Sequence, residues 1–207
     1  MPSPDHALGF VFAALLLTMS PGPDNLMVLS LGASKGKQAG MVFGLGCALG
    51  CLSHTLLAVV GISAMLVASP MAFSVLRYAG GAYLAWLGIQ ALRHSGQSSA
   101  TSGVPADSLR RLFAKGLLAN AINPKVALFF LAFLPQFVSP EIGHVSRQLA
   151  VLGGLFTLQA ACVFATLGYF SGVIGAGLSR RPAWRTWLDR AAGTVFIGLG
   201  LRMAALR

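Results

Sequence analysis

Long apolar stretches separated by short polar loops run through the whole chain. A helix that crosses a bilayer needs roughly 20 predominantly apolar residues, and it satisfies its own backbone hydrogen bonds inside lipid. Six stretches reach that length, so the pattern predicts an all-α polytopic membrane protein with six transmembrane helices. The stretches fall near residues 6–31, 39–68, 71–92, 112–138, 147–178 and 184–204.

Two of these stretches are interrupted by proline at matching places. The first is broken at Pro23 and the fourth at Pro124. An ungapped alignment of the two halves of the chain places Pro23 on Pro124, and it places Asp24 on Lys125. This correspondence indicates a diverged duplication, with three helices in each half.

The duplication predicts the organisation of the domains and a mode of action. The repeats are expected at residues 1–93 and 112–207, joined by a cytoplasmic linker at 94–111. Because each half has an odd number of helices, the second half enters the membrane from the opposite face, which makes the repeats inverted. Two mirror-related conformations, one open inward and one open outward, would then give alternating access.

Composition and charge narrow the class of protein further. Hydrophobic residues make up 56% of the chain and charged residues 10%, whereas soluble domains carry roughly 25% charged residues. The formal charge of +10 comes from basic residues in short loops rather than on one soluble face, which argues against a nucleic-acid partner. The basic loops follow the first, third and fifth stretches, so the positive-inside rule predicts that they are cytoplasmic and that both termini are outside.

The two breaks are the expected substrate site. Proline suits the first turn of a helix, so each break predicts a new half-helix whose free N–H groups and positive dipole end attract a carboxylate. A lone charge at mid-membrane costs on the order of 3 kcal/mol, so the acid and the base are expected to face a cavity or each other. A zwitterion suits both, with its ammonium on the acid. The alternative is that the prolines are structural kinks and the charged side chains snorkel to an interface. The predicted substrate-binding residues are Gly22, Pro23, Asp24, Asn25, Asn123, Pro124 and Lys125.

A polar face in the second stretch leaves several interpretations open. Cys47, Cys51 and His54 recur at i, i+4 and i+7, so they share one face of a helix. That face could hold a soft metal ion, which makes a cadmium-type exporter the alternative function, or it could be a contact between helices. Asp24 and His54 are the candidates for proton coupling, while a packing role for His54 is equally compatible with the sequence.

No catalytic constellation, phosphate loop or nucleotide motif is present in the sequence. The chain is therefore expected not to be an enzyme and to hold no cofactor and no resident metal. A non-transporting membrane scaffold or an intramembrane enzyme is a third interpretation.

Three motifs together resemble the lysine exporter superfamily, in its homoserine and threonine efflux branch. They are Pro21-Gly22-Pro23-Asp24-Asn25, Asn123-Pro124-Lys125 and the run Gly80-Gly81-Ala82-Tyr83-Leu84-Ala85-Trp86-Leu87-Gly88. The resemblance covers nearly the whole chain. It implies export of amino acids or close derivatives from a bacterial cytoplasm across the inner membrane, driven by the proton motive force. The amino acid and the oligomeric state, a homo-oligomer included, stay open.

Overall fold

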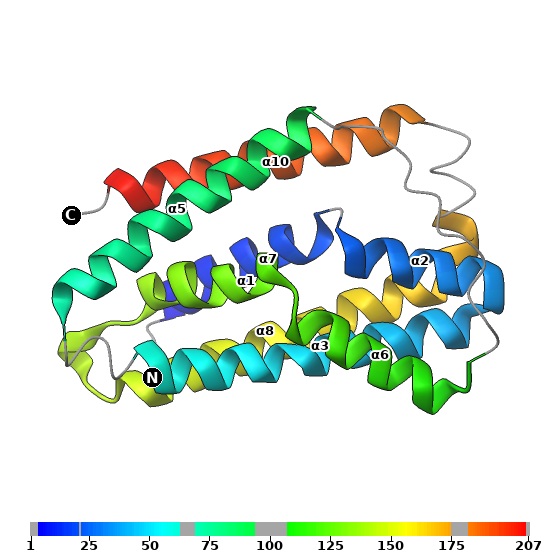
Figure 1. The fold of residues 1–207 in the computed structure, drawn as a ribbon, viewed down its shortest axis with the longest axis horizontal. Helices are drawn as coiled ribbons and strands as arrows, with labels where there is room; N and C mark the ends of the chain where they lie inside the picture. Colours follow the sequence, from blue (N-terminus) through cyan, green and yellow to red (C-terminus); the bar gives the residue numbers. More distant parts are fainter. Residues whose placement is uncertain (1–3, 21, 63–68, 94–106, 175–181, 206–207) are drawn as a thin grey trace.

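Every regular element in the described part of the chain is a helix (Figure 1). The computed structural model describes residues 4–20, 22–62, 69–93, 107–174 and 182–205. Residue 21 of the first break and residues 94–106 of the predicted linker lie outside the described residues. The expectation of an all-α protein is confirmed for the part that is described.

The first half of the chain starts with two helices set at an angle. α1 spans Pro4–Met19 and α2 spans Pro23–Lys35, with a bend of 57° between them. α3 follows at Lys37–Leu57 and continues as the π-helical segment η1, Ala58–Ile62. Gly36 joins α2 to α3 with a φ of 91°, a conformation that side chains disfavour and glycine tolerates. α5 spans Pro70–Arg93.

The second half repeats the start of the first with a second bent pair. α6 spans Leu109–Ala121 and α7 begins at Pro124, with a bend of 47° between them. α7, Pro124–Leu128, leads into the π-helical η2, Phe129–Phe133, and the 3-10 helix η3, Leu134–Phe137. The remaining helices are η4 at Pro140–Ile142, α8 at Val145–Tyr169 and α10 at Pro182–Ala205.

Several of these helices have the length and apolarity that a membrane span requires. Lys37–Ile62 has 26 residues and a mean hydropathy of 1.9, and Val145–Tyr169 has 25 residues and a mean hydropathy of 1.8. The count within the described residues rises from 2 to 4 if each bent pair forms one span. α5 and α10 coincide with the other two predicted stretches, and the arrangement of six spans in inverted repeats stays a prediction.

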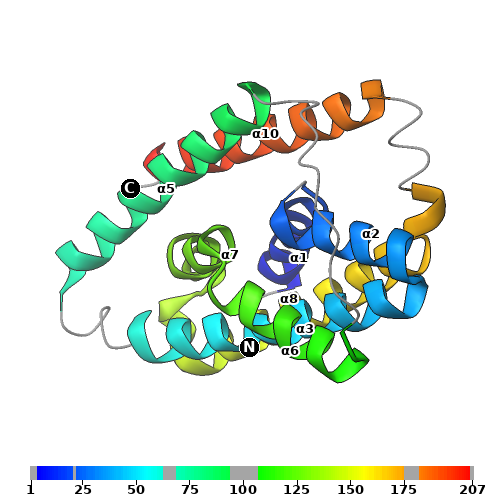
Figure 2. The ribbon, with the colours of Figure 1, turned by 45° about the vertical axis from the view of Figure 1, so that its right-hand side comes forward.

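The helices form three tiers that place both breaks in the middle. Figures 1 and 2 show α5 and α10 as one pair, α3, α6 and α8 grouped opposite them, and α1 and α7 in between. Glycine allows close contacts in each outer group. A Cβ on Gly46 of α3 would lie 2.2 Å from the Phe113 carbonyl oxygen of α6, and one on Gly88 of α5 would lie 2.5 Å from the Gly193 carbonyl oxygen of α10. Such contacts let helix backbones pack closely in lipid, where the hydrophobic effect does not drive helices to associate.

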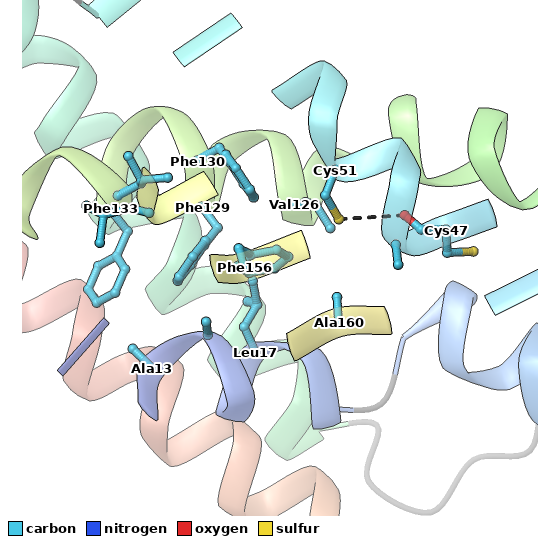
Figure 3. Close-up of a cluster of buried hydrophobic side chains, with 14 of the residues drawn as sticks. Ala13, Leu17, Cys47, Cys51, Val126, Phe129, Phe130, Phe133, Phe156 and Ala160 are labelled. Atoms are coloured by element: carbon cyan, nitrogen blue, oxygen red, sulfur yellow. Dashed lines mark hydrogen bonds between the residues drawn. The ribbon is translucent and has the colours of Figure 1, made fainter. Parts of the chain in front are cut away.

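An aromatic cluster fills the core beside the breaks (Figure 3). Phe129 lies 4.9 Å from Phe133 and 5.6 Å from Phe156, measured between ring centroids. Phe10 of α1 joins them at 6.0 Å from Phe129. All four side chains are at most 2% exposed, so aromatic rings fill the space between α1, η2 and α8.

Candidate functional site

The two breaks line one cavity. Six of the seven residues predicted to bind substrate line its wall, and the seventh, Pro124, begins the adjoining helix α7. The structure therefore brings together residues that lie about half the chain apart. The wall is formed by Leu17, Thr18, Gly22, Pro23, Asp24, Asn25, Cys51, Asn120, Asn123, Lys125, Val126, Phe156 and Phe164.

The Asp24 carboxylate is held by amides from the other half of the chain. Asp24 is 6% exposed, and its Oδ2 accepts hydrogen bonds from Asn120 Nδ2 at 2.8 Å and from Asn123 Nδ2 at 3.1 Å. Hydrogen bonds to an ionised oxygen are stronger than neutral ones, and they offset the cost of burying the charge. Within the described residues no donor reaches Oδ1, which leaves this oxygen available to a cation.

The Lys125 ammonium reaches across to the end of α1. Its Nζ donates to the carbonyl oxygens of Leu17 at 3.1 Å and of Ser20 at 3.2 Å, and to Ser20 Oγ. The last carbonyls of a helix have no partner within it and carry the negative end of the helix dipole. The base of the second break therefore stabilises the helix end that precedes the first break. Nζ also lies 5.2 Å from the centroid of the Phe196 ring.

Asp24 and Lys125 share the cavity without forming an ion pair. Asp107, by contrast, forms ion pairs with Arg111 and Lys115, outside the cavity. Each cavity charge is instead satisfied by polar groups of the opposite break. Asp24 and Lys125, which sequence alignment places in equivalent positions, thus line the same cavity. Each of them binds groups from the other half of the chain.

The two asparagines of the predicted site do different things. Asn25 Nδ2 donates to the carbonyl oxygens of Thr18 at 2.8 Å and of Ser20 at 3.1 Å, so it ties α2 back to the end of α1. Asn123 Oδ1 accepts from the Lys125 backbone N–H at 3.0 Å and caps α7. The start of α2 has Gly22 in the capping position, and no side chain caps it.

Asn120 belongs to the site although sequence reasoning did not select it. It is 1% exposed, and besides its bond to Asp24 it accepts a hydrogen bond from Cys51 Sγ at 3.3 Å. Its backbone oxygen would pair in a continuous helix with the N–H four residues on, but that residue is Pro124, which has none, and the oxygen accepts instead from the Asn123 backbone N–H at 2.9 Å. His54 Nε2 is a second partner of the same oxygen, at 2.8 Å. Pro124 has no backbone N–H to donate to the Asn120 carbonyl, and this was the sequence signal that could have identified Asn120.

His54 stands beside the cavity rather than in its wall. Because a carbonyl oxygen only accepts hydrogen bonds, His54 Nε2 carries the proton that it donates to Asn120. The ring is 2% exposed, lies 5.8 Å from the Phe130 ring between centroids, and leaves Nδ1 without a partner. Asn120 thus links the two predicted proton-coupling residues, His54 through its backbone and Asp24 through its side chain.

The cysteine face offers nothing in favour of the metal interpretation. Among the described residues, no three His, Cys, Asp or Glu side chains gather as a metal-binding group. Cys51 directs its thiol to Asn120 Oδ1 and to the Cys47 carbonyl oxygen at 3.6 Å (Figure 3). Cys47 is fully buried in the core.

Comparison with known proteins finds relatives along almost the whole chain. An uncharacterized membrane protein of Pseudomonas aeruginosa is 34% identical, covering 96% of this chain and 93% of its own. The homoserine/homoserine lactone efflux protein of Salmonella typhimurium is 30% identical, covering 96% of this chain and 95% of its own. The threonine efflux protein of Escherichia coli is also 30% identical, covering 93% and 94%. No solved structure matches the chain.

The family comparison agrees with the motifs at the breaks. The LysE type translocator family matches residues 15–206, a range that contains both breaks and every residue that lines the cavity. The match covers well over half of the 207 residues. With apolar helices long enough to cross a bilayer and relatives named as membrane proteins, this chain is a membrane protein that belongs to the LysE type translocator family.

Proposed function

We propose that this protein is a secondary transporter that exports amino acids or close derivatives from the cytoplasm. One observation carries the proposal: an acidic and a basic side chain, each at a helix break, line a single cavity within apolar helices. Charged groups in such surroundings mark the paths of substrates and ions in membrane proteins. The names of the homoserine and threonine efflux relatives support the same class of substrate.

The proposed binding mode uses opposite charges for the two ends of the amino acid. The substrate ammonium binds Asp24 Oδ1, the oxygen without a protein donor. The carboxylate binds at the uncapped start of α2, where the helix dipole is positive, together with Lys125 Nζ. Lys125 would exchange its carbonyl partners for the substrate, and this exchange couples substrate binding to the end of α1.

Alternating access and proton coupling complete the proposal. The inverted repeats would interconvert between inward-open and outward-open forms around the cavity, with both termini outside and the basic loops in the cytoplasm. Asp24 is the proposed carrier of the coupling proton, and His54 the group that exchanges it through the Asn120 region. The bacterial inner membrane supplies the proton motive force.

Neutralising the cavity acid tests the function directly. Asp24→Asn keeps the volume of the side chain and an acceptor for Asn120 and Asn123, but it removes the charge. We expect the variant to lose amino-acid efflux while it stays inserted and abundant. Glu141→Gln, an exposed carboxylate outside the cavity, is the matched control and should export like the wild type. Efflux of labelled amino acids from cells fed with dipeptides measures both. Wild-type efflux by Asp24→Asn would refute the assignment.

Reporter fusions test the topology separately. A reporter after Arg207 and one within residues 95–107 should lie on opposite sides of the membrane. Finding both reporters in the cytoplasm would remove the inverted-repeat part of the proposal and leave the cavity assignments standing.

A further inference from the structure

Gln159 of α8 holds a buried hydrogen-bond acceptor that has no partner. Gln159 Nε2 donates to Thr18 Oγ1 at 2.8 Å, while Gln159 Oε1 is buried and receives no hydrogen bond. Leaving a buried acceptor unpaired is unfavourable, and native proteins keep few such groups. In the described residues, the other unpaired buried side-chain atom is His54 Nδ1.

The orientation of this amide follows from the chemistry of its neighbour. Thr18 Oγ1 uses its only proton in a hydrogen bond of 2.8 Å to the Ala14 carbonyl oxygen. It can therefore only accept from Gln159, and the group that faces it must be the NH₂ of the amide. Rotating the amide by half a turn would set one acceptor against another. The unpaired atom is consequently the oxygen.

Gln159 lies directly behind the cavity wall, because it is bonded to a residue of the wall but is not itself one of the lining residues. Thr18, the partner of Gln159, lines the cavity, and so does Phe156, which precedes Gln159 by about one helical turn. Figure 3 shows Phe156 and Ala160, on either side of Gln159 in the sequence, next to Leu17 of α1. The charged groups that would hold the backbone of a substrate lie on the same wall at Asp24 and Lys125.

We infer that Gln159 Oε1 is a specificity group that accepts a hydrogen bond from the side chain of the substrate. The inference rests on the proposed export of amino acids and narrows it to amino acids whose side chain carries a hydrogen-bond donor, such as a hydroxyl. An apolar side chain of equal size would leave Oε1 unpaired. A site with a fixed polar partner discriminates strongly against analogues that lack the matching group. Thr18 is the positioning residue, because it fixes the direction of the amide.

The test compares pairs of amino acids that differ by a hydroxyl and a methyl group. The full-length chain, reconstituted in vesicles, is given threonine and valine in equal amounts, and in a second experiment homoserine and norvaline. We expect the wild type to transport the hydroxylated member at least about tenfold faster, the discrimination expected from one buried hydrogen bond. Gln159→Leu removes the acceptor at similar volume, and its ratio should fall to near one.

Matched variants separate this effect from misfolding. Gln136→Leu makes the same change at a part-buried glutamine whose Nε2 donates to the Ala132 carbonyl oxygen, away from the cavity, and should keep the wild-type ratio. Gln159→Asn keeps the amide but withdraws it by one methylene, and its ratio should be intermediate. Because a ratio is independent of the amount of folded protein, a poorly folding variant still reports discrimination.

The outcomes distinguish this inference from the proposed function. Equal transport of both members by the wild type, or an unchanged ratio in Gln159→Leu, would overturn the role of Gln159 while amino-acid export stands. Failure of the wild type to transport any of the four amino acids would overturn this inference, whereas wild-type efflux by Asp24→Asn is the result that would overturn the proposed function.

Discussion

The first break, residues 20–23, and the second break, residues 122–124, are equivalent in the sequence but are stabilised differently. At the second, Asn123 caps the new helix with one end of its side chain and binds Asp24 with the other. At the first, no side chain caps the new helix, and Asn25 reaches back to the carbonyls of α1 instead. The start of α7 is therefore capped by a residue of its own break, whereas the start of α2 has no side-chain cap.

This difference assigns separate tasks to the two breaks. A capped helix start has less to offer an anion, so the substrate carboxylate is expected at the first break and not equally at both. The second break and the residues beside it supply the two amides that hold the Asp24 carboxylate and the lysine that stabilises the end of α1. We propose that the two matching breaks have different roles, the first as a binding element and the second as a supporting element.

The largest effect on stability is expected at the supporting element. Asn123→Ala removes a helix cap and a hydrogen bond to a buried carboxylate, for a combined loss of about 2–4 kcal/mol in the free energy of unfolding. Gly22→Ala is the contrasting change at the first break. Its φ of −166° suits alanine, and the new Cβ would lie 3.4 Å from Lys125 Nζ, so the loss should stay below about 1 kcal/mol. Thermal unfolding in detergent measures both, and equal losses would contradict the division of tasks.

A somewhat smaller loss of stability is expected for Lys125→Met. The change removes the donor to two carbonyls and a hydroxyl at the end of α1, but water that enters through the cavity can replace some of these hydrogen bonds. We expect about 1–3 kcal/mol of destabilisation together with loss of transport. Lys37→Met, at the start of α3 and outside the cavity, is the control for removing a lysine charge. Undiminished transport by Lys125→Met would restrict the binding element to the first break alone.

The double variant measures how strongly the two breaks are coupled. Asp24→Asn and Lys125→Met each leave an opposite charge behind in the same cavity. Removing both should cost about 1 kcal/mol less than the sum of the single losses, and transport should not return. The coupling should be smaller than for a direct pair because each charge has its own partners. Strict additivity in a double-mutant cycle would show that the breaks act independently.

The smallest effect on stability concerns the ion pair between Lys115 and Asp107, ahead of the second break. Lys115 Nζ lies 2.5 Å from Asp107 Oδ2, and this hydrogen bond lowers the pKa of Asp107 below its ordinary value. A lowered folded-state pKa adds stability above the unfolded-state pKa, and the gain is lost as the pH falls through the folded-state pKa. The stability difference between the wild type and Asp107→Asn should be present at neutral pH and vanish in acid. A difference that persists at low pH would mean that the carboxylate charge is not its source.

The sequence by itself determined the class of the protein and the residues around which the cavity forms. Apolar length and proline position are local properties, so the helix starts at Pro23 and Pro124, and the family, were readable from the chain. Only the tertiary structure decided the partners: that Asp24 binds Asn120 and Asn123 rather than Lys125, and that Lys125 binds the end of α1. These contacts join residues about a hundred positions apart, and they depend on how α1 and α2 pack against α6 and α7. Asn120 and Gln159 escaped notice for the same reason, because a polar residue in an apolar helix acquires its meaning from the groups that packing places beside it.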